Sequence, residues 1–203
     1  QMVDVKFSCD LGKDRFHIIQ QRFFVKMQRH RWTFLTFALH FARIDLEGKM
    51  TLLERNDKNA VAHLRMNAPE KLNALSEAML NALQNEFDSL AIDRSIRAVV
   101  LSGAGKAFCA GHDLKEMTVG RQSEDGGKAY FKSLFETCAN MMSSIQKLPQ
   151  PVIAKVHGIA TAAGCQLVSS CDLAVAEDGA RFGVNGVNIG LFCSTPMVAL
   201  SRN

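Results

Sequence analysis

Residues 152–172, which read VIAKVHGIATAAGCQLVSSCD, decide the fold of this chain. Residues 152–156 are mostly apolar and include β-branched side chains, which predicts a short buried strand. Four small residues follow at 161–164, and Leu167, Val168 and Cys171 then recur at the three- and four-residue spacing of a helix. The pattern therefore predicts a strand that passes through small side chains into the first turn of a helix.

This strand-to-helix turn has the features of an anion-binding surface. The first N–H groups of a helix have no partner within the helix, and the helix dipole favours negative charge beside them. Small side chains leave these N–H groups accessible, which suits the stabilisation of an oxyanion. Tight packing of a strand on a helix produces the same pattern, so this stretch alone leaves both interpretations open.

A second stretch, RAVVLSGAGKAFCAGHDL at 97–114, predicts a strand followed by a loop rich in glycine and alanine. Together, SGAGKAFCAGHDL (102–114) and GIATAAGCQLVSSCDLAVA (158–176) resemble the two signature segments of the crotonase, or enoyl-CoA hydratase/isomerase, superfamily. The resemblance covers residues 52–203. It implies an α/β fold with the superfamily's ββα spiral core, whereas the alternation of strands and helices alone indicates only the α/β class.

The resemblance implies an acyl-CoA thioester as the substrate or ligand, with no separate cofactor. In the superfamily, each signature segment gives one backbone N–H to the thioester oxygen, and the matching positions here are His112 and Ala163. The run NAPEKLNALS (67–76) resembles a segment that contacts CoA, although a plain strand-to-helix turn explains it equally well. The implied substrate- and CoA-binding residues, in addition to the two donors, are Lys71, Leu72, Ala74, Ala110, Asp113, Leu114 and Lys115.

The sequence departs from the superfamily at both catalytic glutamates. Hydratases of the superfamily use two glutamates to position water and move its proton, and Gln166 and Gly186 stand at these positions here. The resemblance therefore implies an acyl-CoA lyase or isomerase with weak or altered hydratase chemistry, or else a non-catalytic acyl-CoA-binding or regulatory module. The other polar residues expected near the acyl group are Asn185, Asn188 and His112, of which only His112 titrates near neutral pH and could serve an isomerase- or thioesterase-like reaction.

Composition and charge favour a globular domain and argue against a nucleic-acid-binding or membrane-spanning protein. A chain of 203 residues with 47% hydrophobic and 22% charged residues predicts one soluble globular domain. Residues 1–49 carry nine Lys/Arg against five Asp/Glu, and residues 50–203 carry fifteen of each. The whole net charge of +4 therefore belongs to residues 1–49. Because no nucleic-acid motif and no apolar run near 18 residues occur, neither a nucleic-acid partner nor a membrane span is expected.

Residues 1–49 are predicted to be a basic, aromatic-rich leader, separate from an acyl-CoA-binding domain at 50–203. They hold seven of the thirteen Phe and the only Trp, and no acidic residue occurs from Arg15 to Ile44. Three interpretations stay open: translated upstream sequence before a natural start at Met50, an organelle transit peptide, or a docking helix. The first interpretation predicts a cytoplasmic protein, and the second predicts the mitochondrial matrix.

The C-terminal residues lead to expectations about how much of the superfamily core is present and about the oligomeric state of a full-length member. Residues 194–196 predict the start of a helix with Pro196 in its first turn, whereas superfamily members continue with several more helices. We therefore expect a core truncated before the C-terminal helices, and a homotrimer or hexamer for a full-length member. The runs TAAGCQL (161–167) and GVNIGLFCSTP (186–196) look most like one mitochondrial group of the superfamily.

The cysteines predict a reducing compartment rather than disulfides or a metal site. Six cysteines occur without a secretory signal, and Cys109, Cys165 and Cys171 have apolar or small neighbours typical of buried free thiols. Cys109 and His112 could suggest a zinc site, but no second pair has matching ligand spacing. No metal is expected.

Overall fold

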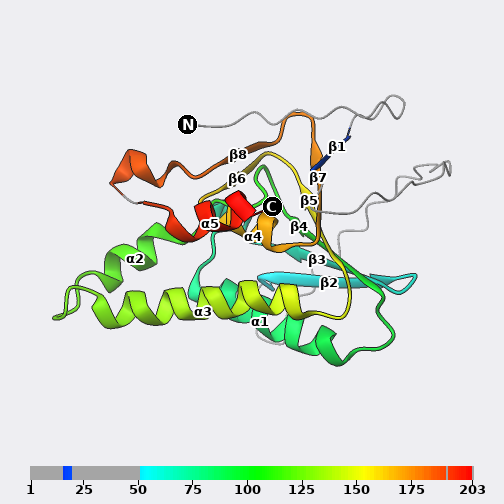
Figure 1. The fold of residues 1–203 in the computed structure, drawn as a ribbon. Helices are drawn as coiled ribbons and strands as arrows, with labels where there is room; N and C mark the ends of the chain where they lie inside the picture. The colour runs from blue at the N-terminus through cyan, green and yellow to red at the C-terminus, as the bar shows by residue number, and fades with distance from the viewer. Residues whose placement is uncertain (1–15, 20–50, 191, 203) are drawn as a thin grey trace.

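A six-stranded sheet forms the centre of the computed structural model, which describes residues 16–19, 51–190 and 192–202 (Figure 1). Its strand order is β1-β7-β5-β4-β3-β2. The four central strands are parallel, and β2 and β1 join antiparallel at the two edges. The strands are β1 (Phe16–Ile19), β2 (Leu53–Lys58), β3 (Val61–Met66), β4 (Ala98–Gly103), β5 (Val152–Val156) and β7 (Leu173–Glu177).

A smaller parallel pair, β6 (Ile159–Thr161) with β8 (Arg181–Gly183), lies beside the main sheet. The helices are α1 (Glu77–Ile92), α2 (Leu114–Gly120), α3 (Lys128–Lys147), α4 (Ala163–Ser170) and α5 (Ser194–Arg202), and the 3-10 turns are η1 (Pro69–Lys71) and η2 (Asn185–Ile189). Helix α1 packs against α3, and α4 packs against α3 and α5 (Figure 1). In the described part of the chain, no helix is long and apolar enough to cross a membrane.

Helices α1 and α3 cover the core with apolar stripes. The Ser76 hydroxyl accepts a hydrogen bond from the Met79 N–H and caps α1, which is the role that a serine directly before an apolar helical stripe predicts. On α3, helical spacing in the sequence predicts a buried face made of Phe131, Leu134, Phe135, Cys138 and Met142, and this prediction is partly wrong. Leu134, Cys138 and Met142 are buried, but Phe135 is 49% exposed because the α3 stripe continues through Met141 and Ile145 instead.

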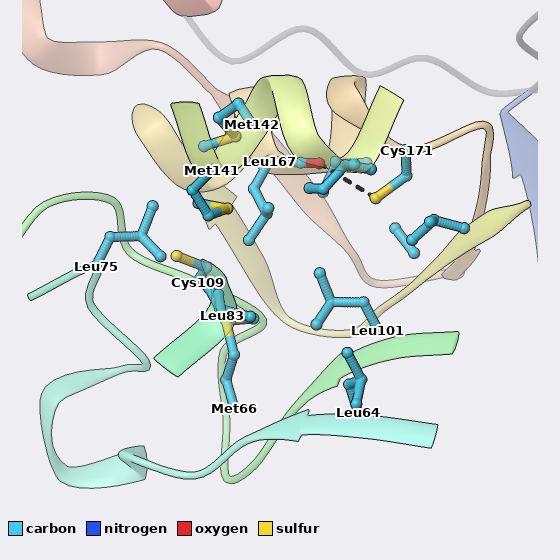
Figure 2. Packing of buried hydrophobic residues seen from close by; sticks show 14 of the residues in the cluster. Leu64, Met66, Leu75, Leu83, Leu101, Cys109, Met141, Met142, Leu167 and Cys171 are labelled. Atoms are coloured by element: carbon cyan, nitrogen blue, oxygen red, sulfur yellow. Dashed lines mark hydrogen bonds between the residues drawn. The ribbon is translucent and has the colours of Figure 1, made fainter. Parts of the chain in front are cut away.

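The core lies between the strands and helices α1, α3 and α4. Figure 2 shows side chains from all of these elements meeting in it, among them Leu101, Leu83, Met141 and Leu167. Cys109 also points into this core from the loop after β4, which anchors that loop to the interior.

The structure confirms that Cys109, Cys165 and Cys171 are buried free thiols, and Cys138 is a fourth. Burial raises the pKa of the Cys109 thiol to about 12 and that of Cys165 to about 11, so both remain protonated at neutral pH. Thiols in this state are poor nucleophiles and poor metal ligands.

Strand β1 lies inside the predicted leader. Its backbone pairs with β7 from Phe16 opposite Glu177 to Ile19 opposite Ala174, so this short segment extends the edge of the main sheet. The rest of residues 1–49 lies outside the described residues, and the domain boundary at residue 50 stays a prediction.

Two glycines allow residues 158–164 to lie directly on residues 106–109. A Cβ atom on Gly158 would lie 2.1 Å from the Lys106 carbonyl oxygen, and one on Gly164 would lie 2.3 Å from the Cys109 carbonyl oxygen. Hydrogen bonds tie the same segments together, from the Cys109 N–H to the Ile159 oxygen (3.2 Å) and from the Thr161 N–H to the Cys109 oxygen (3.0 Å). The start of α4 is therefore fixed by backbone contact.

We expect the Gly164→Ala substitution to lower the free energy of unfolding by about 1–3 kcal/mol, because the added methyl group overlaps the Cys109 carbonyl. Intrinsic helix propensity would act in the opposite direction, since alanine favours a helix over glycine. Gly179→Ala is the matched control, because nothing lies within 4 Å of its added Cβ atom. Urea unfolding of both variants tests the expectation, and equal midpoints would contradict it.

Candidate functional site

Three chain segments meet at Gly111. The Gly111 carbonyl accepts a hydrogen bond from the Leu75 N–H at 2.7 Å, which joins the loop before α1 to the loop before α2. On the other side, a Cβ atom at Gly111 would lie 3.1 Å from the Ala162 Cβ and 3.3 Å from the Ala163 nitrogen. Gly111 also has a φ of +90°, which favours glycine. A glycine is therefore required where the predicted site segments converge.

The two predicted donors, His112 and Ala163, flank this point. Ala163 is the first residue of α4, so its N–H has no partner within the helix. Within the described residues, neither this N–H nor that of His112 has a hydrogen-bond acceptor. Neither group is thus paired within this part of the protein, and the dipole of α4 favours negative charge beside Ala163.

Ala162 sets the direction of the Ala163 N–H. Its backbone has φ 51° and ψ −123°, in a region that non-glycine residues seldom occupy. The Ala162 N–H donates to the Gly183 carbonyl at 2.8 Å, and the Ala162 carbonyl accepts from Gln166 and Cys165. The sequence suggests this turn only through its run of small residues, because alanine does not signal a positive φ.

The predicted CoA-contacting residues lie together on the other side of Gly111. The Ala110 N–H donates to the Leu72 carbonyl at 3.0 Å, and the Lys71 ammonium forms an ion pair with Asp113 at 3.1 Å. Ala74 is buried beside this contact, whereas the side chains of Leu114 and Lys115 are exposed on α2. The structure therefore brings the predicted residues of both segments to one place, while their role in binding stays a prediction.

Asn73 is a supporting residue that the sequence analysis missed. Its fully buried amide donates to the Ala104 and Ala107 carbonyls, both at 2.8 Å, and accepts from the Ala68 N–H at 3.0 Å. Its φ of +52° is one that asparagine tolerates better than most residues. This side chain holds the loop at 67–76 against the loop at 104–107, and a lone asparagine in a turn gives no sequence signal of that role.

The His112 side chain packs against an aromatic residue of α3. Its ring lies 5.7 Å from the Phe135 ring in an edge-to-face arrangement. Burial lowers the pKa of His112 and outweighs the Leu75 carbonyl, which raises it, so the imidazole is neutral at pH 7. In the described part of the chain, His, Cys, Asp and Glu side chains form no group of three or more that could hold a metal ion.

Comparison with known proteins identifies the family. The model of the enoyl-CoA hydratase/isomerase family matches residues 56–202. The chain belongs to the enoyl-CoA hydratase/isomerase family.

The most similar relatives include a named group of this family. The mitochondrial enoyl-CoA hydratase domain-containing protein 3 of Xenopus laevis is 47% identical over 153 residues, which are 75% of this chain and 50% of the relative. The human protein of the same name is 46% identical over 71% of this chain and 46% of the relative. This is the group that the sequence resemblance indicates. The chain spans about half the length of the curated relatives it matches.

Solved structures of family members share the fold. A Mycobacterium smegmatis enoyl-CoA hydratase matches with a TM-score of 0.71 and 60% identity over 75% of this chain and 58% of that chain. The human enoyl-CoA hydratase domain-containing protein 3 matches with a TM-score of 0.69 and 43% identity over the same shares of the two chains. The α/β fold of the crotonase type is therefore confirmed.

Gln166 and Gly186, which are predicted to occupy the family's glutamate positions, carry no side-chain acid or base. The Gln166 carbonyl oxygen Oε1 accepts a hydrogen bond from the Thr195 hydroxyl on α5 at 2.9 Å. Gly186 is buried in η2, and the preceding Gly183 carbonyl accepts from the Thr161 hydroxyl at 3.1 Å. Thr195 is a second residue that the sequence analysis missed, because its contact joins segments 29 residues apart.

The Asp113 carboxylate yields a prediction about pH. Burial raises the pKa of Asp113, but the Lys71 ammonium and the N–H groups of Lys115 and Glu116 together hold it below its ordinary value. A depressed folded-state pKa means that the carboxylate stabilises the fold above its unfolded pKa, near 3.9, and that this contribution is lost as pH falls through the folded pKa.

We therefore expect Asp113→Ala to lower the free energy of unfolding by about 0.5–2 kcal/mol at pH 7, because α2 loses its cap. Asp113→Asn keeps a capping oxygen and loses only the ion pair to Lys71, which is half-exposed, so it should cost less. The difference between wild type and Asp113→Asn should shrink from pH 7 to pH 3. Urea unfolding at both pH values measures it, and a difference that grows on acidification would refute the assignment.

Proposed function

We propose that this chain binds an acyl-CoA thioester, with the thioester oxygen accepting hydrogen bonds from the N–H groups of His112 and Ala163. The observation that carries the proposal is the convergence at Gly111 of two N–H groups that have no acceptor in the described residues. A thioester carbonyl is an uncharged acceptor that becomes more negative during enolisation or addition. Donors held by backbone contacts need no rearrangement as this charge develops.

The Lys71, Leu72 and Ala74 segment supports the CoA part of the proposal. It lies beside the donor loop through the hydrogen bond from Ala110 to Leu72 and the ion pair from Lys71 to Asp113. An exposed ammonium and backbone groups next to the donors suit the polar, phosphate-bearing half of CoA. No further cofactor enters this proposal, because the thioester carries its own activated carbonyl.

Turnover by hydration is proposed to be weak. Adding water across a double bond needs a group that takes a proton from water and one that returns a proton to carbon. An amide at Gln166 and a hydrogen atom at Gly186 do neither near neutral pH. His112, one of the two proposed donor residues, has a titratable side chain, and its neutral imidazole suits an isomerase- or thioesterase-like proton transfer.

The second candidate is an acyl-CoA-binding or regulatory module without turnover. The observation that favours it is the hydrogen bond from Thr195 to the amide oxygen of Gln166, which engages the side chain at a predicted catalytic position with another part of the protein. Binding without consumption of any acyl-CoA would distinguish this module from an enzyme.

Mitochondrial localisation is proposed from the relatives, because the matching proteins from frog and human carry the word mitochondrial in their names. The cytoplasmic expectation has no support from these relatives. A homotrimer or hexamer stays the prediction for a full-length family member.

The proposed thioester contact is tested with two ligands that differ in one oxygen. Butyryl-CoA has the thioester carbonyl, whereas S-butyl-CoA is a thioether without it. Losing two hydrogen bonds should weaken binding by about 5- to 100-fold in calorimetry. Gly111→Ala should reduce this difference, because the added methyl group crowds the Ala163 nitrogen. Equal affinity of the wild-type chain for both ligands would by itself contradict the proposal, whatever the Gly111→Ala variant does.

The proposed loss of hydration is tested with the double variant Gln166→Glu, Gly186→Glu. Compared with a two-glutamate relative, the wild-type chain should hydrate a short trans-2-enoyl-CoA at least about 10³-fold more slowly. The double variant should recover part of that rate. Spectrophotometric loss of the enoyl double bond is the measurement. Wild-type rates equal to those of the relative would mean that the acid–base groups lie elsewhere.

A further inference from the structure

Gln166 lies one helical turn after Ala163 on the same face of α4. The Cβ atoms of helical residues three apart are about 5–6 Å from each other, and their side chains lean toward the helix N-terminus. The Gln166 N–H donates to the Ala162 carbonyl at 3.1 Å, so the backbone there is regular. The Gln166 amide therefore extends over the first turn of α4, next to the proposed binding point of the thioester oxygen.

The contact with Thr195 gives this amide a defined orientation. A glutamine amide has one accepting oxygen and one NH₂ group with two donors. The Thr195 hydroxyl donates to the oxygen Oε1 at 2.9 Å, which leaves the nitrogen Nε2 as the part available to a ligand. Within the described residues, Nε2 has no acceptor.

We propose that Thr195 is a positioning residue that turns the NH₂ group of Gln166 toward the acyl chain, and that Gln166 thereby selects acyl groups with an acceptor oxygen on the third carbon. This inference rests on the proposed function, because it needs the thioester at Ala163. The third carbon is two bonds beyond the thioester carbon, so its oxygen lies within reach of a group one helical turn from the Ala163 N–H.

The proposed role differs from a simple loss of a catalytic acid. An ionised carboxylate at this position would offer only acceptors to a ligand, whereas the oriented amide offers donors. The hydrogen-bond polarity of the position is thus reversed.

Acetoacetyl-CoA and butyryl-CoA provide the test, because they differ by one oxygen on the third carbon. Calorimetry on the full chain should give about 2- to 10-fold tighter binding of acetoacetyl-CoA. Thr195→Ser keeps the hydroxyl and should keep this ratio. Thr195→Val and Gln166→Met should bring the ratio close to one, because acetoacetyl-CoA then loses the hydrogen bond that distinguishes it from butyryl-CoA. Ser194→Ala is the matched control on the same exposed end of α5 and should behave as wild type.

Each remaining outcome overturns a defined part of the proposal. Equal wild-type affinities, with butyryl-CoA bound, would remove the selective role of Gln166. A ratio that survives Thr195→Val, or one that Ser194→Ala also abolishes, would remove the positioning role of Thr195. Failure of the wild-type chain to bind butyryl-CoA would instead overturn the proposed function itself, and with it this inference.

Discussion

The whole arrangement depends on close backbone contact between the loop after β4 and the start of α4. Gly158 and Gly164 face atoms of the opposing segment at a distance that leaves no room for a side chain, and a methyl group at Gly111 would make tight contact with Ala162 and Ala163. This contact fixes the loop that carries His112 against the first turn of α4, which begins with Ala163. The groups that define this candidate site are therefore backbone N–H groups rather than reactive side chains.

That constraint separates what the sequence could predict from what it could not. Strand β5, the turn and α4 were predictable because small residues and two hydrophobic periodicities follow one another within residues 152–172. The convergence with residues 71–75 was accessible only through the family resemblance, because no local pattern reports a hydrogen bond between Leu75 and Gly111. The buried face of α3 was misjudged at Phe135, where two apolar stripes compete and only tertiary packing selects one.

The residues that support the site were harder to predict than the site itself. Asn73 and Thr195 are ordinary polar residues in sequence, and each acts through partners on a different segment. Such long-range contacts depend on the final positions of several elements at once, so local propensity contains no information about them. The protonation states of His112 and Cys109 also depend on tertiary structure. Burial lowers the pKa of His112, which keeps the imidazole neutral, and raises the pKa of Cys109, which keeps the thiol protonated.

The strained backbone of Ala162 has a consequence for dynamics. A glycine at this position would adopt the same angles at lower steric cost, but it would also sample many others. The methyl group of alanine removes most of those alternatives, so the local conformational entropy of the turn is small once the surrounding hydrogen bonds form. The positive φ of Ala162 lowers the stability of the turn, but it also restricts the orientation of the Ala163 N–H to a narrow range. The methyl group of Ala162 therefore makes the Ala163 amide rigid.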